Sequence, residues 1–368
     1  MKYTPLGRPA RRRSVTSVVL IALCTFLAMT LFTALLSLGT CIFSWGGQCY
    51  HGYESPYSFN VDKAYNPDWM AWIPDDVNIT SLSIPGTHDT MTFDMVNNIQ
   101  LQCQNYNFTT QLHAGMRYFD IRGRLVNHTI GIYHSISYTG YTFTDVLLDM
   151  FAFLEDHPTE AIVMRLKEEG RPVGDIARQW NKTFEEVFNE FRFKNPETSP
   201  GFSKYLYEVP ASSPQSAYLP TMGDLRGKIL LLENFPAVER HYGLVWDSDL
   251  MELEDLWVIP TIDQLEDKWA AIEANLNLAR QAPDDNSVLF LSHLSASFGV
   301  LPIEAAAGPL SDKSILGMND RTGQWLDDSS TTGRTGIVII DFPGKDLVDI
   351  VIEQNAGLAK RSVEGLEW

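Results

Sequence analysis

Positively charged side chains are scarce in this sequence after its first residues. The 368-residue chain has 28 Lys and Arg against 46 Asp and Glu. Before Glu54 it has five basic residues and no acidic one, so the remainder carries a net charge of −23. Such a surface repels DNA and RNA, which argues against a nucleic-acid partner. It also disfavours adsorption of the body to anionic bilayers.

The sequence also lacks the glycine-rich loops that bind nucleotide phosphates, and it has few cysteines. Neither GxGxxG nor GxxxxGK[ST] occurs, so a nucleotide cofactor is not indicated. Of four cysteines, Cys24 and Cys41 lie in or beside an apolar run, which leaves Cys49 and Cys103 for the body. In an oxidising compartment these two could form a disulfide, and two free thiols are the alternative.

An apolar run near the N-terminus predicts a membrane anchor. Residues 15–38 contain no Asp, Glu, Lys or Arg, and about 20 such residues span a bilayer core. A cleaved secretory signal is the alternative, although its apolar region is usually only about 7–15 residues long. Because Arg11 to Arg13 precede the run, the chain after it is expected on the lumenal or extracellular side. We therefore expect a basic cytoplasmic tail over 1–13, a transmembrane signal-anchor over 14–43 and a stalk over 44–75.

Four glycosylation sequons agree with this single-pass topology. N-x-S/T sequons are modified only in the secretory pathway, and the chain carries them at Asn78, Asn107, Asn127 and Asn181. The body is therefore expected to be a glycoprotein at the cell surface or in a secretory compartment.

After residue 75, short apolar runs alternate with helical patterns. Strands are expected at AIVMRL, KILLLEN, SVLFLSH and GIVIID, all rich in residues that suit a strand buried on both faces. Helical stretches such as DVLLDMFAFLEDHP lie between them. This alternation indicates a parallel sheet covered by helices. With about seven or eight strands, we expect a closed, irregular TIM-type β/α barrel over residues 76–360.

Ionisable side chains follow several of these strands. In a β/α barrel the carboxyl ends of the strands meet at one face and build the active site. The residues at these ends are His88, Asp89, Asp120, Arg122, His134, Lys167, His293 and Asp341. Two histidines can remove and deliver the protons of a phosphodiester cleavage by an internal hydroxyl. An arginine can offset the phosphoryl charge without a metal, and carboxylates can orient the imidazoles.

Five segments resemble the X domain of phosphatidylinositol-specific phospholipase C in its bacterial, metal-independent form. They are SIPGTHDT, AGMRYFDIRGRL, IYHS, AIVMRLKEE and GIVIIDF, spread over most of residues 76–352. The resemblance implies a phosphodiesterase that acts on phosphatidylinositol or an inositol glycolipid. Its products would be diacylglycerol and a 1,2-cyclic inositol phosphate.

The resemblance also assigns the catalytic roles. His88 resembles the general base that takes the proton of the inositol 2-hydroxyl, and Asp341 the carboxylate that orients it. His134 resembles the general acid, with Asp89 assisting it, and Arg122 would bind a phosphate oxygen. Calcium-dependent relatives have Asn after the first histidine and acidic ligands near the second motif. With Asp89 and Arg122 in this chain instead, no metal or other cofactor is expected.

Recognition of the headgroup is less defined. Lys167 matches a family lysine near the substrate, and EDKW resembles a family segment in which an acid binds ring hydroxyls beside a stacking aromatic. The resemblance implies these roles for Asp267 and Trp269, but the same segment also reads as a helix start with Asp267 in its first turn. KILLLEN ends in Glu233 and Asn234, where bacterial relatives often carry a basic residue, so strict specificity for inositol stays open.

Two other functions stay open on the sequence. The GTHD start also suggests a metal-dependent glycerophosphodiesterase or sphingomyelinase D on the same barrel, but those need clustered acids for magnesium, among which Arg122 fits badly. A non-enzymatic lipid- or glycan-binding barrel is the other, and the complete set of histidines, arginine and carboxylates speaks against it. Asp120 is expected to hold Arg122 in place, and His293 has no role in the motifs. The oligomeric state is not indicated.

Overall fold

The computed structural model describes residues 50, 52–174, 182–209, 219–238, 240–284, 287–328 and 332–358. The tail predicted over 1–13 and the signal-anchor predicted over 14–43 lie outside these residues. Among the helices that the structure does describe, none is both long and apolar enough to cross a membrane.

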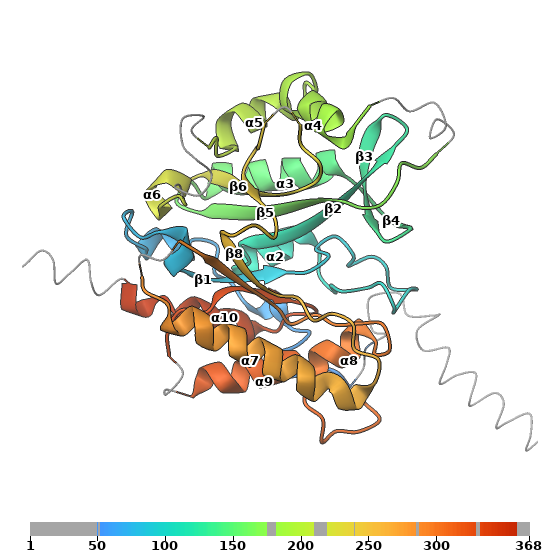
Figure 1. Ribbon diagram of the computed structural model, residues 1–368, viewed down its shortest axis with the longest axis vertical. Helices are drawn as coiled ribbons and strands as arrows, with labels where there is room; N and C mark the ends of the chain where they lie inside the picture. Colours follow the sequence, from blue (N-terminus) through green and yellow to red (C-terminus); the bar gives the residue numbers. More distant parts are fainter. Residues whose placement is uncertain are drawn as a thin grey trace, which may run out of the picture. The chain divides into compact units, whose positions relative to one another are not determined.

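A curled sheet of parallel strands forms the centre of the body (Figure 1). Its hydrogen-bonded order is β7-β6-β5-β2-β1-β10-β9-β8, with parallel pairing throughout, and an antiparallel hairpin of β3 and β4 extends from β2. The strands are β1 (Ser83–Thr87), β2 (Tyr118–Val126), β3 (Thr129–His134), β4 (Ser137–Thr142), β5 (Ala161–Glu168), β6 (Lys228–Asn234), β7 (Leu244–Val245), β8 (Met251–Glu254), β9 (Leu289–His293) and β10 (Gly336–Ile340). The four apolar runs singled out in the sequence are thus confirmed as β5, β6, β9 and β10.

The sheet does not close into a complete barrel. β7 and β8 stand at the two ends of the strand order, and no ladder joins them in the described part of the chain. Both are short, with two residues in β7 and four in β8, which leaves little backbone for pairing. The parallel β/α architecture is confirmed, and the closure expected from the sequence is wrong.

Helices cover the outside of the sheet. Figure 1 shows α3, α4 and α5 on one side, and α7, α9 and α10 on the other. The helices are α2 (Phe108–Ala114), α3 (Phe143–Asp156), α4 (Phe184–Phe193), α5 (Ser199–Tyr205), α6 (Met222–Leu225), α7 (Leu265–Gln281), α8 (Pro302–Ala307), α9 (Met318–Asp327) and α10 (Lys345–Glu353), with short 3-10 turns η1 (Val61–Lys63), η2 (Trp69–Trp72), η3 (Ile79–Ser81) and η5 (Ile262–Gln264).

Helix α3 shows how the sequence fixes these elements. It starts at a capping box in which Thr142 and Asp145 satisfy each other's backbone N–H groups. Its apolar residues then recur at helical spacing, and Val146, Leu147 and Met150 are fully buried. The helix is therefore held to the sheet by one continuous apolar face.

The segment predicted as a loosely packed stalk over 44–75 belongs to the core in its described part. Trp69 and Met70 are buried. The buried ion pair of Arg117 and Glu160 explains this, with Nη2 and Oε2 separated by 2.7 Å. Arg117 donates to two backbone carbonyls of the segment, and Glu160 accepts from the N–H of Met70. These charged groups hold the segment against the residues that precede β2. Apolar periodicity carries no signal for such contacts, so the sequence did not predict them.

The first sequence motif, SIPGTHDT, begins with residue 83 on strand β1 and continues past the carboxyl end of this strand. Gly86 lies opposite Tyr118 of β2, and a Cβ on Gly86 would lie 2.5 Å from the Cβ of Tyr118, so only glycine allows this approach. On its other side β1 pairs with β10, with Thr87 opposite Ile340. The next residues along the two strands, His88 and Asp341, therefore leave the sheet side by side.

Candidate active site

A cavity of about 920 Å³ lies at the carboxyl ends of the parallel strands. Six of the eight strand-end residues identified in the sequence line it: His88, Arg122, His134, Lys167, His293 and Asp341. Asp89 and Asp120 are almost fully buried behind the wall and contact its residues. Residues distant in sequence thus meet at one site, as expected for parallel strands.

His88 is held by two different hydrogen bonds. Its Nδ1 lies 2.9 Å from Oδ1 of Asp341, and its Nε2 lies 2.6 Å from Nη2 of Arg122. Arginine only donates, so Nε2 accepts, and Nδ1 carries the proton that Asp341 accepts. Burial first, and then the charge of Arg122, lower the pKa of His88 well below its usual value, so this imidazole is neutral near pH 7. Burial, followed by the carboxylate of Asp89, raises the pKa of Asp341.

Arg122 connects the carboxylates of the site. Its Nη1 lies 2.9 Å from Oδ2 of Asp89, and its Nε and Nη2 lie 3.1 and 3.0 Å from Oδ2 of Asp120. Asp120 also lies 3.4 Å from Nη1 of Arg165. Burial alone would raise the pKa of Asp120, but Arg122 and Arg165 hold it well below its usual value. Asp120 is thus an ionised carboxylate placed where it can orient Arg122.

Asp89 lies between the two histidines. Its Oδ2 is 3.3 Å from Nε2 of His88 and 3.3 Å from Nε2 of His134. Nδ1 of His134 is 2.7 Å from the carbonyl oxygen of Leu101, so Nδ1 donates there and Nε2 faces Asp89. Burial is the largest influence on Asp89 and raises its pKa. One carboxylate oxygen therefore faces Nε2 of both imidazoles and can accept a hydrogen bond from whichever of them is protonated.

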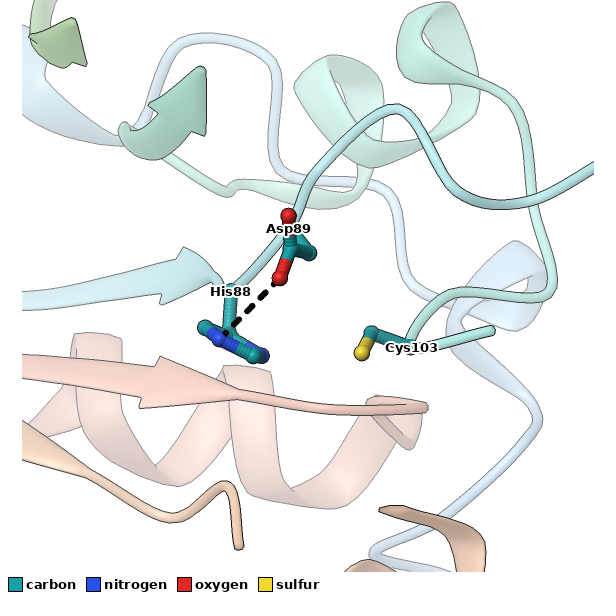
Figure 2. A group of neighbouring side chains, drawn as sticks. All are labelled: His88, Asp89 and Cys103. Atoms are coloured by element: carbon teal, nitrogen blue, oxygen red, sulfur yellow. Dashed lines mark ion pairs between the residues drawn. The ribbon is translucent and has the colours of Figure 1, made fainter. Parts of the chain in front are cut away.

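Cys103 lies beside this pair, and Figure 2 shows its side chain near those of His88 and Asp89. Among the described residues, only these three offer potential metal-ligand atoms within 4.8 Å of one another. Both His88 and Asp89 already contact Arg122. Burial also raises the pKa of the Cys103 thiol well above its usual value, which disfavours the thiolate that a metal requires. The donor set therefore fits a metal poorly. Cys103 is a free buried thiol, and Cys49 lies outside the described residues.

Two cations on β5 face the cavity. Lys167, expected near the substrate, pairs with Glu169 at 2.8 Å. Arg165 shares its face of the strand, and its guanidinium is held by Oδ1 of Asn234 at distances of 3.1 and 2.8 Å. The guanidinium carbon also lies 3.8 Å from the centre of the Trp246 ring. Arg165 thus supplies a cation beside Asn234, where the sequence lacked one. The sequence signal for Arg165 is a charged residue inside an apolar strand, and Arg165 was not among the predicted site residues.

Asp267 and Trp269 do not reach the cavity. Asp267 is exposed in the first turn of α7, Trp269 packs against the core, and neither lines the cavity. The structure therefore agrees with the alternative reading of this segment as a helix start. This corrects the expectation that the two residues bind substrate, because α7 runs along the outside of the sheet.

Asp255 and Trp257 line the cavity instead, directly after β8. The pattern E-D-x-W occurs twice in the sequence, at 254–257 and at 266–269, and only the first copy follows a strand. This copy was not predicted as part of the site because β8 is short and half polar, and so gives no clear strand signal. The second copy has a structural task, because its Lys268 forms a buried ion pair with Glu254, Nζ to Oε1 2.8 Å.

Comparison with known proteins agrees with this geometry. Residues 82–234 match the family model for the phosphatidylinositol-specific phospholipase C X domain. A 1-phosphatidylinositol phosphodiesterase of Listeria monocytogenes is 30% identical over 329 residues, covering 85% of this chain and 92% of the relative. One of Staphylococcus aureus is 25% identical over 82% of this chain and 98% of the relative.

The same similarity appears among solved structures. The phosphatidylinositol-specific phospholipase C from Listeria monocytogenes superimposes with a TM-score of 0.64 and 29% identity, over 79% of this chain and 99% of that one. A Staphylococcus aureus structure, at 21% identity and a TM-score of 0.63, shares the fold. The fold and the site define an enzyme. The chain belongs to the phosphatidylinositol-specific phospholipase C X-domain family.

Proposed function

We propose that this protein is a phosphatidylinositol-specific phospholipase C that cleaves phosphatidylinositol or an inositol glycolipid by acid–base catalysis without a metal ion. The observation that carries this proposal is the contact of Arg122 with both His88, at 2.6 Å, and Asp89, at 2.9 Å. A phosphodiester needs a cation at its oxygens. Here the guanidinium of Arg122 contacts both His88, the proposed base, and Asp89, the carboxylate beside the proposed acid His134.

The first step uses His88. A bound phosphate attracts Arg122, which frees the Nε2 lone pair of His88 for the 2-hydroxyl of the inositol ring. Nε2 takes the hydroxyl proton while the hydroxyl oxygen attacks phosphorus. The imidazolium that forms is stabilised by Asp341, whose Oδ1 lies 2.9 Å from Nδ1. The lowered pKa of His88 keeps it unprotonated before the reaction.

The second imidazole completes the reaction. His134, protonated at Nε2, gives its proton to the glycerol oxygen as the bond between that oxygen and phosphorus breaks. Asp89 stabilises the charged form of His134 across 3.3 Å. The products are diacylglycerol and the 1,2-cyclic inositol phosphate. The cyclic phosphate can then be hydrolysed slowly by the same two histidines with their roles reversed.

We assign recognition of the inositol ring to cavity residues that the sequence motifs did not all include. Lys167, Arg165 and Asp255 line the cavity around the catalytic group and offer two donors and one acceptor. Trp257, half exposed at the cavity, offers an aromatic face for the ring. These residues take the tasks expected from Asp267 and Trp269.

The membrane context is part of the proposal. The acidic body needs a tether to reach lipid, and the signal-anchor predicted over 14–43 would supply one. In this proposal the catalytic body lies in the secretory lumen or outside the cell, on the side of the membrane where inositol glycolipids are displayed. The sequons then make it a glycoprotein.

The test is hydrolysis of phosphatidylinositol in detergent micelles by the purified full chain in excess EDTA, followed by phosphorus NMR. We expect a five-membered cyclic phosphate from the wild type and none from His88→Ala. His241→Ala is the matched control, because His241 pairs with Glu233 and does not line the cavity. Turnover only after addition of magnesium or calcium, or equal rates in His88→Ala and wild type, would overturn the proposal in favour of a metal-dependent phosphodiesterase or a binding protein.

A further inference from the structure

A third histidine lines the cavity without a task in the reaction above. His293 ends β9 and is 1% exposed. Its Nδ1 lies 2.9 Å from the backbone carbonyl oxygen of Glu254. A carbonyl oxygen only accepts, so Nδ1 carries the ring proton and Nε2 holds a lone pair.

The Nε2 atom of His293 is unsatisfied. It is buried and has no hydrogen-bond partner among the described residues. Buried polar atoms are nearly always paired, so an unpaired acceptor in a cavity wall points to a ligand that completes it. The ring is fixed on two sides, with its centroid 6.1 Å from that of Trp246 and 6.4 Å from that of His88, both nearly perpendicular to it.

The residue that holds His293 is itself rigid. Both carboxylate oxygens of Glu254 bind Nζ of Lys268, at 2.8 and 2.9 Å, and the N–H of Leu256 donates to one of them. Lys268 is fully buried. The carbonyl that fixes the tautomer therefore has little freedom to move.

The charges around His293 favour its neutral form. Burial is the largest influence and lowers its pKa, Asp255 opposes this from 4.0 Å, and Arg165 and Lys268 lower the pKa further. A neutral imidazole with Nδ1 protonated is a hydrogen-bond acceptor at Nε2, so His293 does not act as a cation toward the phosphate.

We propose that Nε2 of His293 accepts a hydrogen bond from a free hydroxyl of the substrate's polyol ring, other than the hydroxyl deprotonated by His88. The inference rests on the proposed function and adds a specificity-determining residue to it. With 6.4 Å between their centroids, the two imidazoles can contact one six-carbon ring. Substituting that hydroxyl with a phosphate removes the donor and places anionic oxygens against a lone pair, so His293 selects rings that are unsubstituted there.

The test compares two soluble substrates with the same nitrophenyl leaving group, an inositol phosphodiester and the phosphodiester of 1,2-propanediol. Both contain the attacking hydroxyl, and only the first has further ring hydroxyls. In His293→Leu, the ratio of kcat/KM for the inositol ester to that for the diol ester should fall about 10-fold to 30-fold, as for a lost hydrogen bond. The control His241→Leu should keep the wild-type ratio.

The outcomes separate this inference from the proposed function. An unchanged ratio in His293→Leu, with both rates reduced equally, assigns His293 a purely structural role and refutes the inference while leaving the phospholipase function intact. If the wild type cleaves neither ester, the proposed function fails and the inference with it. If His293→Leu does not fold, the wild type labelled with ¹⁵N-histidine decides. Titration with myo-inositol should shift the Nε2 resonance of His293 and leave Nδ1 protonated, whereas an Nε2 resonance that does not move refutes the inference.

Discussion

Replacing Asp341 with asparagine should separate activity from stability. The substitution keeps the shape of the side chain and removes its charge. At 2.9 Å from Nδ1 of His88, a carboxylate stabilises the imidazolium by about 6 kcal/mol at an effective dielectric constant near 20. Asp89 and Asp120 share part of this task, so we expect a loss of about 3–5 kcal/mol in the transition state, or roughly 10²–10⁴-fold in kcat.

The same substitution should raise the thermal stability. Burial raises the pKa of Asp341 in the folded state, so ionisation of this carboxyl costs folding free energy above its unfolded pKa, which is about 3.9. The neutral asparagine avoids this cost. The melting temperature of Asp341→Asn should therefore exceed that of the wild type at pH 7.5, and the difference should disappear as the pH falls toward about 4.

Two assays on one preparation test both effects: initial rates on phosphatidylinositol micelles in EDTA and calorimetric melting from pH 4 to 8. Asp346→Asn is the matched control, because Asp346 is about half exposed and pairs with Lys345 at 3.4 Å. This surface pair should contribute less than about 1 kcal/mol. A fall in kcat of less than tenfold, or a lower melting temperature at pH 7.5, would refute the reasoning about Asp341.

Further predictions concern the charges around the cavity. Since His88 must be unprotonated and its pKa is lowered, the acid limb of kcat/KM should lie below the usual imidazole value of about 6.5; a midpoint at or above that value contradicts the assignment. Asp120→Asn should release Arg122 and reduce kcat by about 10-fold to 100-fold in the EDTA assay, with a smaller change in KM; an unchanged kcat would show that Asp120 is not needed. Lys268→Met should destabilise the fold by about 3–5 kcal/mol in urea unfolding, because it leaves the carboxylate of Glu254 buried and unpaired. The double variant with Glu254→Gln should recover most of this lost stability. If it does not, the loss comes from the packing of the Lys268 side chain and not from its charge.

The strands that position the proposed catalytic residues were predictable from the sequence. β5, β6, β9 and β10 are continuous apolar runs, which give a clear signal because both faces are buried. The motifs at the ends of β1 and β10 then predicted that His88 and Asp341 lie together. In the structure Thr87 pairs with Ile340, so the next residues along the two strands, His88 and Asp341, lie side by side.

Other features depend on contacts that no local pattern encodes. β8 is four residues long with alternating glutamates, so the sequence shows no clear strand before Asp255 and Trp257. The substrate-binding roles were therefore predicted for the second E-D-x-W copy, at 266–269. The segment around Trp69 is held by hydrogen bonds to Gly115, Arg117 and Glu160, all of them far away in the sequence. The incomplete closure of the sheet reflects the length of its two end strands, β7 and β8, and strand length is the least certain part of such a prediction.

The shared oxygen of Asp89 has a consequence for turnover. It lies 3.3 Å from Nε2 of each imidazole and 2.9 Å from Nη1 of Arg122, so one carboxylate oxygen faces two histidines and a guanidinium. In the mechanism proposed above, only one of the two histidines carries the extra proton at any stage of the reaction. A cycle that stops at the cyclic phosphate moves this proton from His134 to His88 and releases the enzyme as a protonation isomer of its starting form. Return to the active isomer is then a separate kinetic step, which exchange with solvent and buffer must complete before the next lipid is cleaved.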